Sequence, residues 1–416
     1  MKKNLVSLLI GSVLWATPLL MFAQQATTVF PDKVNVKVNP PTWLFHADTV
    51  IIPNHEARLA PQEQFLAEEL RGFLSNADYQ AAANVLESYQ NLTKSSALLQ
   101  VSGQVYLALE QWKEAEQVLL KAIKQDPGLS RSHRSLAVIY LQKKAYGKAH
   151  KHISQAIALG QRDAQLFGQL AYINIQNGQP WSAISGYQNA LLLDPANTQW
   201  QQGLLAALVQ SGQYSDANGL VEDLLVNDPR NVDLWLRRGQ IALNLEHHNK
   251  ALSSFEMALR YGEKTISNQL LTAKLHIQHG SVEQATLLLT RVLTQDIFQF
   301  SQLHNTFAWL LQNQRYEQVD ELLATISQPS KLSVFDQSQY FTFKGQLAAA
   351  KKQSTKAVIA YEKALSLDGN NGQVLLALAE HFSKKQSYSR AELYYIRASA
   401  LNSVKEQALL GHAQLE

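Results

Sequence analysis

Small residues recur along the chain at a fixed spacing of 34 residues. The first column of this series is Ala115, Ala149, Ala183, Ala217, Ala251 and Ala285. Val319 continues it, and Ala357 and Ala391 resume the spacing after a four-residue insertion. Two more small-residue columns run in the same register, twelve positions before and seven positions after the first. Three columns in one register indicate an internal repeat.

Each 34-residue unit predicts two helices joined by a short turn. Large side chains such as Leu119, Tyr187 and Phe255 lie four positions after the alanine column, and Asp-Pro pairs such as Asp126-Pro127 end the units. Proline removes a backbone donor and therefore marks a helix boundary. Small residues on facing helices let the backbones approach, while the large ones fill the next layer. The pattern predicts an all-α fold.

We count nine full units and predict a first helix at the start of each. These starts are Ser96, Ser130, Ala164, Thr198, Val232, Ile266, Ser301, Ser338 and Gly372. A divergent hairpin containing Tyr79 precedes them, and Leu409 to Leu415 begins a final helix. The seventh unit departs from the pattern because Ala308 to Val319 is one residue short and Gln328-Pro329-Ser330-Lys331 lengthens the connection to the eighth unit. We expect a local irregularity there.

These columns resemble the tetratricopeptide repeat, whose unit is a 34-residue pair of antiparallel helices. The resemblance covers residues 62–416. It implies a right-handed superhelical solenoid of about nine to ten repeats, in which each hairpin leaves an apolar face that only its neighbour can cover. It also implies that positions 2, 5, 9, 12 and 13 of each unit point into a concave groove lined by the first helices.

The segment 1–23 predicts an export signal. Lys2 and Lys3 give a positive start, and Leu5 to Ala23 is apolar without any charge. This is typical of a secretory signal peptide cleaved after Ala23, which would place the mature protein in the periplasm. The alternative is an uncleaved helix, residues 5–23, that anchors the chain in the inner membrane.

The segment 24–61 predicts an extended N-terminal arm before the solenoid at 62–416. Five prolines from Pro31 to Pro61 exclude a long helix, and Val34, Val36 and Val38 alternate as in extended chain. One interpretation is a linker that packs loosely against the first hairpin. The other is that Trp43 to Ile52 docks on the solenoid or on a partner by strand addition.

Composition narrows the class of protein further. The 416 residues are 46% apolar and contain no cysteine, so a core can form without disulfides, and the lack of thiols suits an oxidising compartment. The chain has 37 Lys and Arg and 34 Asp and Glu, which gives a net charge of +3. This overall positive charge is too small to attract nucleic acid, so we expect no nucleic-acid partner. We expect membrane association only through partners or an uncleaved N-terminal helix.

Catalytic and metal-binding patterns are absent from the sequence. It contains no Walker-type phosphate loop, no nucleophile elbow and no His-Glu-x-x-His motif. His276 and His279 have no carboxylate nearby in sequence, and His247-His248 fall at a turn where polar residues are expected. We therefore predict that the protein is not an enzyme and has no cofactor and no metal site.

The predicted groove is rich in amides. Mapping its five positions onto nine units gives 45 residues, of which 18 are Gln or Asn and six are charged. Amide side chains both donate and accept hydrogen bonds, which suits an extended peptide backbone or sugar hydroxyls. The groove lacks the Lys, Asn and Arg cluster by which chaperone-binding members of the family hold a carboxylate.

Nine residues are the candidate partner-binding set. They are Arg134, Tyr172, Gln176, Gln202, Gln240, Asn244, Lys274, Trp309 and Asn313. Tyr172 and Trp309 are candidate binding anchors, since aromatic side chains often dominate affinity. The alternatives are that the amides reflect a Gln-rich protein and that Trp309 packs inside the irregular seventh unit. Trp235 is expected in the core, because it occupies the large apolar position 4 of its unit.

The signal and the repeats together predict a non-catalytic scaffold or adaptor that binds extended segments of partner proteins in a bacterial envelope assembly. Pilus and secretion machinery, TonB-type transport and polysaccharide export are all compatible with it. One alternative is a polysaccharide-binding module whose amide and aromatic groove holds glycan chains. Another is a regulatory subunit of an envelope enzyme.

Overall fold

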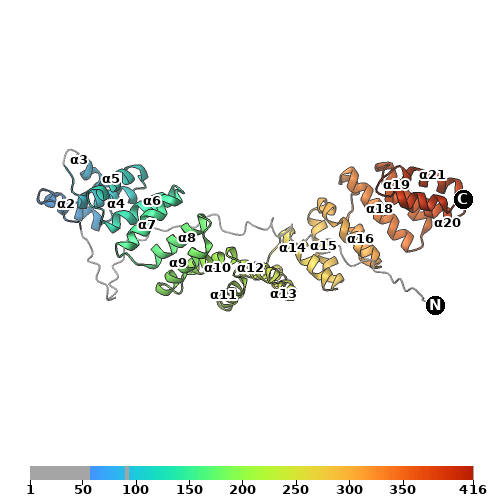
Figure 1. Cartoon of the computed structure of the whole chain (residues 1–416), viewed down its shortest axis with the longest axis horizontal. Helices are drawn as coiled ribbons and strands as arrows, with labels where there is room; N and C mark the ends of the chain where they lie inside the picture. Colours follow the sequence, from blue (N-terminus) through green and yellow to red (C-terminus); the bar gives the residue numbers. More distant parts are fainter. Residues whose placement is uncertain (1–56, 90–92, 416) are drawn as a thin grey trace, which may run out of the picture. The chain divides into compact units, whose positions relative to one another are not determined.

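The computed structural model describes residues 57–89 and 93–415. The predicted signal and the arm up to residue 56 lie outside these ranges. Every regular element of the described residues is a helix, which confirms the all-α prediction (Figure 1). The chain divides into two compact units, unit 1 up to Ala217 and unit 2 from Asn218, and the boundary falls inside α11 (Tyr214–Asn227).

Unit 1 is built from consecutive pairs of helices, in which α4 packs on α5, α6 on α7 and α8 on α9. Its elements are η1 (Pro61–Glu63), α2 (Gln64–Ser75), α3 (Tyr79–Ser88), α4 (Ser96–Ala108), α5 (Trp112–Gln125), α6 (Ser130–Gln142), α7 (Tyr146–Ala158), α8 (Ala164–Gln176), α9 (Pro180–Leu193) and α10 (Thr198–Gln210). The hairpin α2–α3 is the divergent one expected around Tyr79.

Unit 2 repeats the same pairing, with α12 on α13, α14 on α15, α18 on α19 and α20 on α21. Its elements are α12 (Val232–Asn244), α13 (His248–Arg260), α14 (Ile266–Gln278), α15 (Val282–Gln295), η2 (Ile297–Leu303), α16 (His304–Gln312), α17 (Tyr316–Thr325), η3 (Pro329–Lys331), α18 (Val334–Ala350), α19 (Ser354–Leu367), α20 (Gly372–Lys384), α21 (Tyr388–Ser399) and α22 (Lys405–Ala413). Among all described helices, none is long and apolar enough to cross a membrane.

Seven of the nine predicted first helices begin at the predicted residue. They are α4, α6, α8, α10, α12, α14 and α20. The residue before the start often caps the helix: Asp163 accepts a hydrogen bond from the Leu166 amide at 2.9 Å, and Asn231 accepts one from the Leu234 amide at 3.2 Å. Such caps satisfy amides that the first turn leaves without a helical partner. The capping residues therefore specify the 34-residue register in addition to the buried residues of the core.

The alanine column forms the spine of the core. Every member of that column, including Val319, Ala357 and Ala391, is at most 2% exposed. The large residues four positions later are also buried, with Leu119 at 0% and Phe255 at 3% exposure. The burial confirms the small-and-large packing expected from the sequence.

Glycines of the second small-residue column lie directly against these large side chains. A Cβ atom at Gly103 would come within 2.4 Å of Leu119, and one at Gly345 within 2.5 Å of Tyr361. A Cβ at Gly239 would lie 2.9 Å from the Phe255 ring. These glycines are therefore required for space rather than for an unusual backbone conformation.

The seventh repeat is irregular, as expected, but its helices do not begin where the sequence predicted. A 3-10 segment, η2, occupies the predicted start at Ser301, and α16 begins at His304. The first helix of the eighth repeat, α18, begins at Val334 and not at Ser338. Ser333 caps this helix by accepting a hydrogen bond from the Asp336 amide at 3.1 Å. The early cap adds a turn that the 34-residue spacing does not anticipate.

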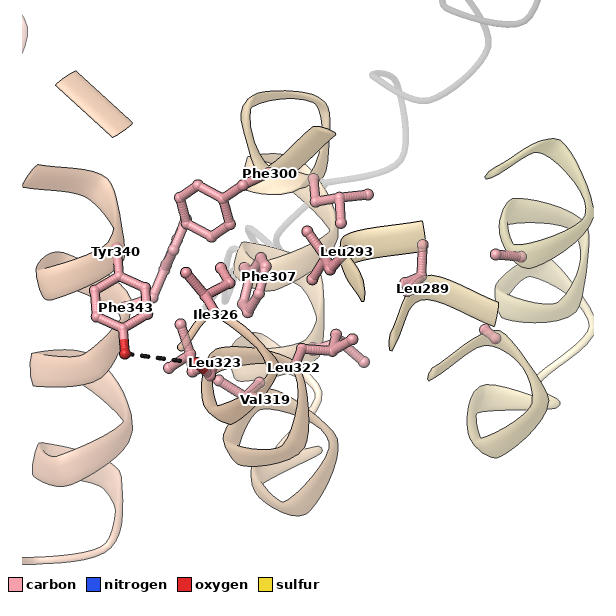
Figure 2. Close-up of a cluster of buried hydrophobic side chains, with 14 of the residues drawn as sticks. Leu289, Leu293, Phe300, Phe307, Val319, Leu322, Leu323, Ile326, Tyr340 and Phe343 are labelled. Atoms are coloured by element: carbon pink, nitrogen blue, oxygen red, sulfur yellow. Dashed lines mark hydrogen bonds between the residues drawn. The ribbon is translucent and has the colours of Figure 1, made fainter. Parts of the chain in front are cut away.

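Aromatic side chains fill the space that this irregularity creates. Phe307 of α16 stacks on Phe343 of α18 with ring centroids 5.1 Å apart, and Phe300 of η2 meets Phe307 edge to face at 5.3 Å (Figure 2). The Tyr340 hydroxyl donates to the Leu323 carbonyl at 3.5 Å, which ties α18 to α17. The seventh repeat therefore has a locally distinct core.

Two further expectations are corrected. Trp235 is half-buried, not core: its indole N–H donates to the Pro229 carbonyl at 2.9 Å, and Arg238 lies 5.4 Å from its ring centroid. Trp200, one position earlier in its own repeat, is the buried tryptophan at 7% exposure. The last helix begins at Lys405, four residues before the predicted Leu409.

Ala183→Leu tests the close approach of α8 and α9. The leucine has no space at a site that is 0% exposed, so overpacking should lower the free energy of unfolding by about 1–3 kcal/mol. Thermal or urea unfolding measures the change. Gln188→Leu, an exposed site on the same helix, is the matched control, and an equal effect of both variants would contradict the packing.

Gln386→Gly tests backbone strain in the turn between paired helices. Gly178, Gly212 and Gly280 occupy this turn position in other repeats with φ between 71° and 78°, whereas Gln386 has φ 60° with a side chain. Glycine adopts this left-handed conformation without steric cost, so the variant should be about 0.5–1 kcal/mol more stable in urea unfolding. Lys384→Gly, at the last residue of α20, should instead destabilise, because its backbone is helical, and stabilisation by both variants would exclude a turn-specific effect.

Candidate partner-binding face

The first-helix face comprises positions 2, 5, 9, 12 and 13 of the nine first helices. Its 18 predicted amides are Gln100, Gln104, Gln142, Gln165, Gln176, Gln199, Gln202, Gln210, Gln240, Asn244, Gln278, Gln302, Asn305, Gln312, Asn313, Gln339, Gln346 and Gln373. None of them is buried: 11 are exposed and seven are half-buried. Most of them therefore remain accessible on the surface of each unit, whereas the side-chain oxygens of Gln100 and Gln165 accept hydrogen bonds from Ser132 and Arg134.

Amides end successive first helices. In unit 1, Gln142, Gln176 and Gln210 are the last residues of α6, α8 and α10, and all three are exposed. In unit 2, the same place in α12, α14 and α16 is taken by Asn244, Gln278 and Gln312, also exposed. Each unit thus presents a row of three amides, one per repeat.

Arg134 connects two repeats of unit 1. Its guanidinium pairs with the Asp163 carboxylate at 2.7 Å and donates to the Gln165 side-chain oxygen at 2.7 Å. Because Asp163 also caps α8, the guanidinium is held by the next repeat. Gln176 and Gln202, by contrast, are exposed, so the amides are the more accessible members of the predicted set here.

Tyr172 lies half-buried on α8 against Tyr146 of α7, with the two rings edge to face and their centroids 6.2 Å apart. Burial raises the pKa of Tyr172 to about 12, and a hydrogen bond with the Tyr146 side chain adds to the shift. Its hydroxyl is therefore neutral at physiological pH. The ring is only partly available as an anchor.

The predicted residues of unit 2 are less uniform. Trp309 is half-buried and packs against the aromatic core of the seventh repeat, and its carbonyl accepts a hydrogen bond from Asn313 at 2.8 Å. Asn244 donates in the same way to the Gln240 carbonyl at 2.8 Å. Lys274 is half-buried on α14.

Two predicted amides of unit 2 meet at a polar hollow. Gln339 of α18 and Gln373 of α20 line a hollow of about 320 Å³ together with Asp368, Asn370 and Ser403. Asn371 also lines this hollow, and its side chain donates to the Thr342 hydroxyl at 3.1 Å, which ties the start of α20 to α18. The first-helix face is thus indented where two repeats meet.

The histidines at the α12–α13 turn line a second hollow, of about 480 Å³. His247 and His248 lie there with His279. Within residues 57–89 and 93–415, no three His, Cys, Asp or Glu side chains are arranged to hold a metal ion. His276 is separate: it is 5% exposed, and its Nε2 lies 3.3 Å from Glu256.

Comparison with protein families decides the identity of the repeats. Two models described as tetratricopeptide repeat match the chain, one at residues 101–164 and 204–264 and the other at residues 338–371. The repeats of this chain are therefore identified as tetratricopeptide repeats. No curated protein matches its sequence.

Solved structures of other proteins are similar to this chain at low identity. YrrB, described as a tetratricopeptide protein with an unusual peptide-binding site, is 18% identical with a TM-score of 0.42, over 45% of this chain and 96% of its own. PilW, a type IV pilus biogenesis factor, is 16% identical with a TM-score of 0.36, over 49% and 93%. The Naa15/Naa10 complex with HypK-THB is 13% identical with a TM-score of 0.44, over 85% and 66%.

Sequence reasoning missed one buried polar pair in these tetratricopeptide repeats. His133 of α6 and His152 of α7 are each 8% exposed, and their Nδ1 atoms are 2.9 Å apart. One ring donates and the other accepts, so the accepting ring is neutral. The two residues occupy positions 4 and 23 of one repeat, and only the pairing of those positions across the hairpin could have revealed them.

The electrostatics of this pair favour the neutral rings. Burial lowers the pKa of His152 to about 4, and the adjacent His133 and Lys151 add to the effect while Glu116 opposes it. Burial also lowers the pKa of His133, again with Lys151 adding and a backbone hydrogen bond to Pro127 opposing. The Tyr140 ring stacks on His152 at 5.4 Å and donates its hydroxyl to Glu116 at 2.8 Å.

Acidification should therefore destabilise unit 1. The unfolded chain binds a proton at His152 near pH 6.5 and the folded chain only near pH 4, so stability is lost as pH falls through this window. We expect a loss of about 1–2 kcal/mol between pH 7 and pH 5 in urea unfolding. His152→Asn should flatten this dependence, and His150→Asn on the same helix should not. Equal pH profiles for the parent chain and His152→Asn would contradict the assignment.

Proposed function

We propose that this chain is a non-catalytic scaffold of a bacterial cell envelope that holds extended segments of partner proteins on its first-helix face. The row of exposed amides at the ends of successive first helices carries the proposal. An extended peptide offers alternating N–H and C=O groups along its backbone, and each amide side chain can serve either one. Charge is scarce on this face, so recognition rests on hydrogen bonding.

Some of the few charged side chains of the first-helix face already form ion pairs within the chain. Arg134 pairs with Asp163, and Asp233 pairs with Arg237 at 2.6 Å. They contribute to packing between or within repeats and are less available for a partner. This leaves the amides as the groups that a partner would meet first, and an acidic or phosphorylated segment would find few free cations there.

A peptide suits the face better than a glycan. Glycan binding is favoured by broad, accessible aromatic side chains on which sugar rings can stack. The two candidate aromatic residues, Tyr172 and Trp309, are both half-buried against neighbouring side chains. The amides remain, and their spacing of one per repeat suits an extended chain. Glycan capture is therefore an outcome that a crosslinking experiment must distinguish.

The N-terminal sequence supports the proposed location in the envelope. Lys2 and Lys3 followed by the uncharged apolar stretch to Ala23 are typical of an exported chain, and the lack of cysteine agrees with an oxidising compartment. The proposal places the repeats in the periplasm, with cleavage after Ala23 or anchoring through residues 5–23 as the two alternatives.

Site-specific photocrosslinking in intact cells tests the proposal. A photoreactive residue at Gln202, exposed on the first-helix face, should give protein adducts with envelope partners. The matched control is Gln188, exposed on the second helix of the preceding repeat. Adducts at both positions, adducts only at Gln188, or carbohydrate adducts at Gln202 would each overturn the peptide-binding function of this face.

A further inference from the structure

Positive charge is concentrated in one stretch of unit 1. Residues 117–162 contain nine Lys and Arg and a single carboxylate, Asp126, whereas the whole chain carries 37 basic and 34 acidic residues. The near-neutral total therefore conceals a local excess. An excess of this size on one surface attracts anions, and screening by salt weakens that attraction.

Two of these lysines lie on the side of the second helices that points away from the first helices. Lys124 on α5 and Lys151 on α7 are exposed there, whereas Lys148, also exposed, lies over the Tyr140 ring of the first helix α6, 5.3 Å from its centroid. Ala115 and Ala149, on the opposite sides of the same helices, are 0% exposed. We call the exposed residues of α5, α7 and α9 the outer face of unit 1.

The nearby carboxylates neutralise the positive charge of this face only in part. Glu116 pairs with Lys143, and Asp163 pairs with Arg134, so the two acids that flank the stretch are already occupied. Glu114 is an exposed carboxylate on α5 itself. Burial lowers the pKa of Lys94, and repulsion from Lys121 adds to this shift while Glu63 opposes it.

The next second helix, α9, has a different surface. It contains no charged residue, and Trp181 and Leu192 on it are 65% and 78% exposed. These two residues stand at the repeat positions of Lys113 and Lys124 on α5, so they point to the same side of their repeat. Large apolar side chains left in water beside lysines are typical of surfaces that meet the membrane interface.

We propose that the outer face of unit 1 binds an anionic lipid surface. The lysines of α5 and α7 meet lipid phosphates, and Trp181 and Leu192 enter the interfacial layer. A soluble acidic polymer would match the lysines equally well, but it would leave the two exposed apolar residues without a role. The face lies on second helices and so goes beyond the proposed peptide-binding face, and neither assignment depends on the other.

Vesicle sedimentation of the full chain tests the charge component. Binding to vesicles of phosphatidylglycerol and phosphatidylcholine should exceed binding to pure phosphatidylcholine at least about tenfold and should fall with added salt. The double variant Lys124→Glu, Lys151→Glu should lower the affinity for the anionic vesicles by about tenfold or more. The matched control, Lys264→Glu with Lys331→Glu, makes the same change of charge at exposed sites of unit 2 and should alter the affinity less than about twofold.

A second pair of variants tests the apolar component. Trp181→Ser with Leu192→Ser should weaken binding to the anionic vesicles by about tenfold, whereas Phe298→Ser, 62% exposed in unit 2, should not. All variants keep the same N-terminal segment, so differences between them report on the outer face. Circular dichroism checks that each variant is folded.

The proposal would be overturned by any of three results. The first is equal binding to neutral and anionic vesicles. The second is an equal loss of binding in the control with charge reversals in unit 2. The third is unchanged binding of Trp181→Ser with Leu192→Ser together with full competition by polyglutamate, which would assign the lysines to an acidic polymer.

Discussion

The structure depends on the close approach of two helices inside each repeat. That approach is possible because a residue with little or no side chain faces a large one, as Gly103 faces Leu119 and Gly345 faces Tyr361. The residues of the alanine column on the second helix are then at most 2% exposed. Once these contacts fix the rotation of both helices, the remaining sides must face outward. The amides of the first helices and the lysines of the second helices occupy those sides, so both proposed surfaces derive from the same packing.

Polar contacts between successive repeats add specificity to this apolar packing. Asn371 bonds to Thr342, and Ser132 donates to the Gln100 side chain at 3.1 Å. Each contact joins residues about one repeat apart, so it stabilises the stacking of neighbours rather than a single hairpin. The consequence for function is that Arg134 and Asp163 act mainly inside the stack, and the accessible chemistry of the first-helix face is that of neutral amides.

The seventh repeat shows what happens where the small-residue rule is relaxed. Position 319 of the alanine column is a valine. The first helices on either side of it, α16 and α18, do not begin at the predicted residues. Phe300, Phe307 and Phe343 fill the resulting space, and Trp309 packs against this cluster. An aromatic core of this kind does not need the close helix approach, because large rings bridge wider gaps. The candidate anchor Trp309 is therefore tied to the stability of its repeat.

The sequence by itself determined the class of fold, the 34-residue register and seven first-helix starts, because buried small residues and helix caps are local and repeat in phase. It also identified the amides that face outward. Only the tertiary structure decided the start of α18, the partial exposure of Trp235 and the His133–His152 pair, since each depends on a contact between residues of different elements or on a local turn. The exposure of Trp181 and Leu192 was decided in the same way: the excess of lysine and arginine in residues 117–162 can be counted in the sequence, but only the packing of the helices decides which side chains stay in water.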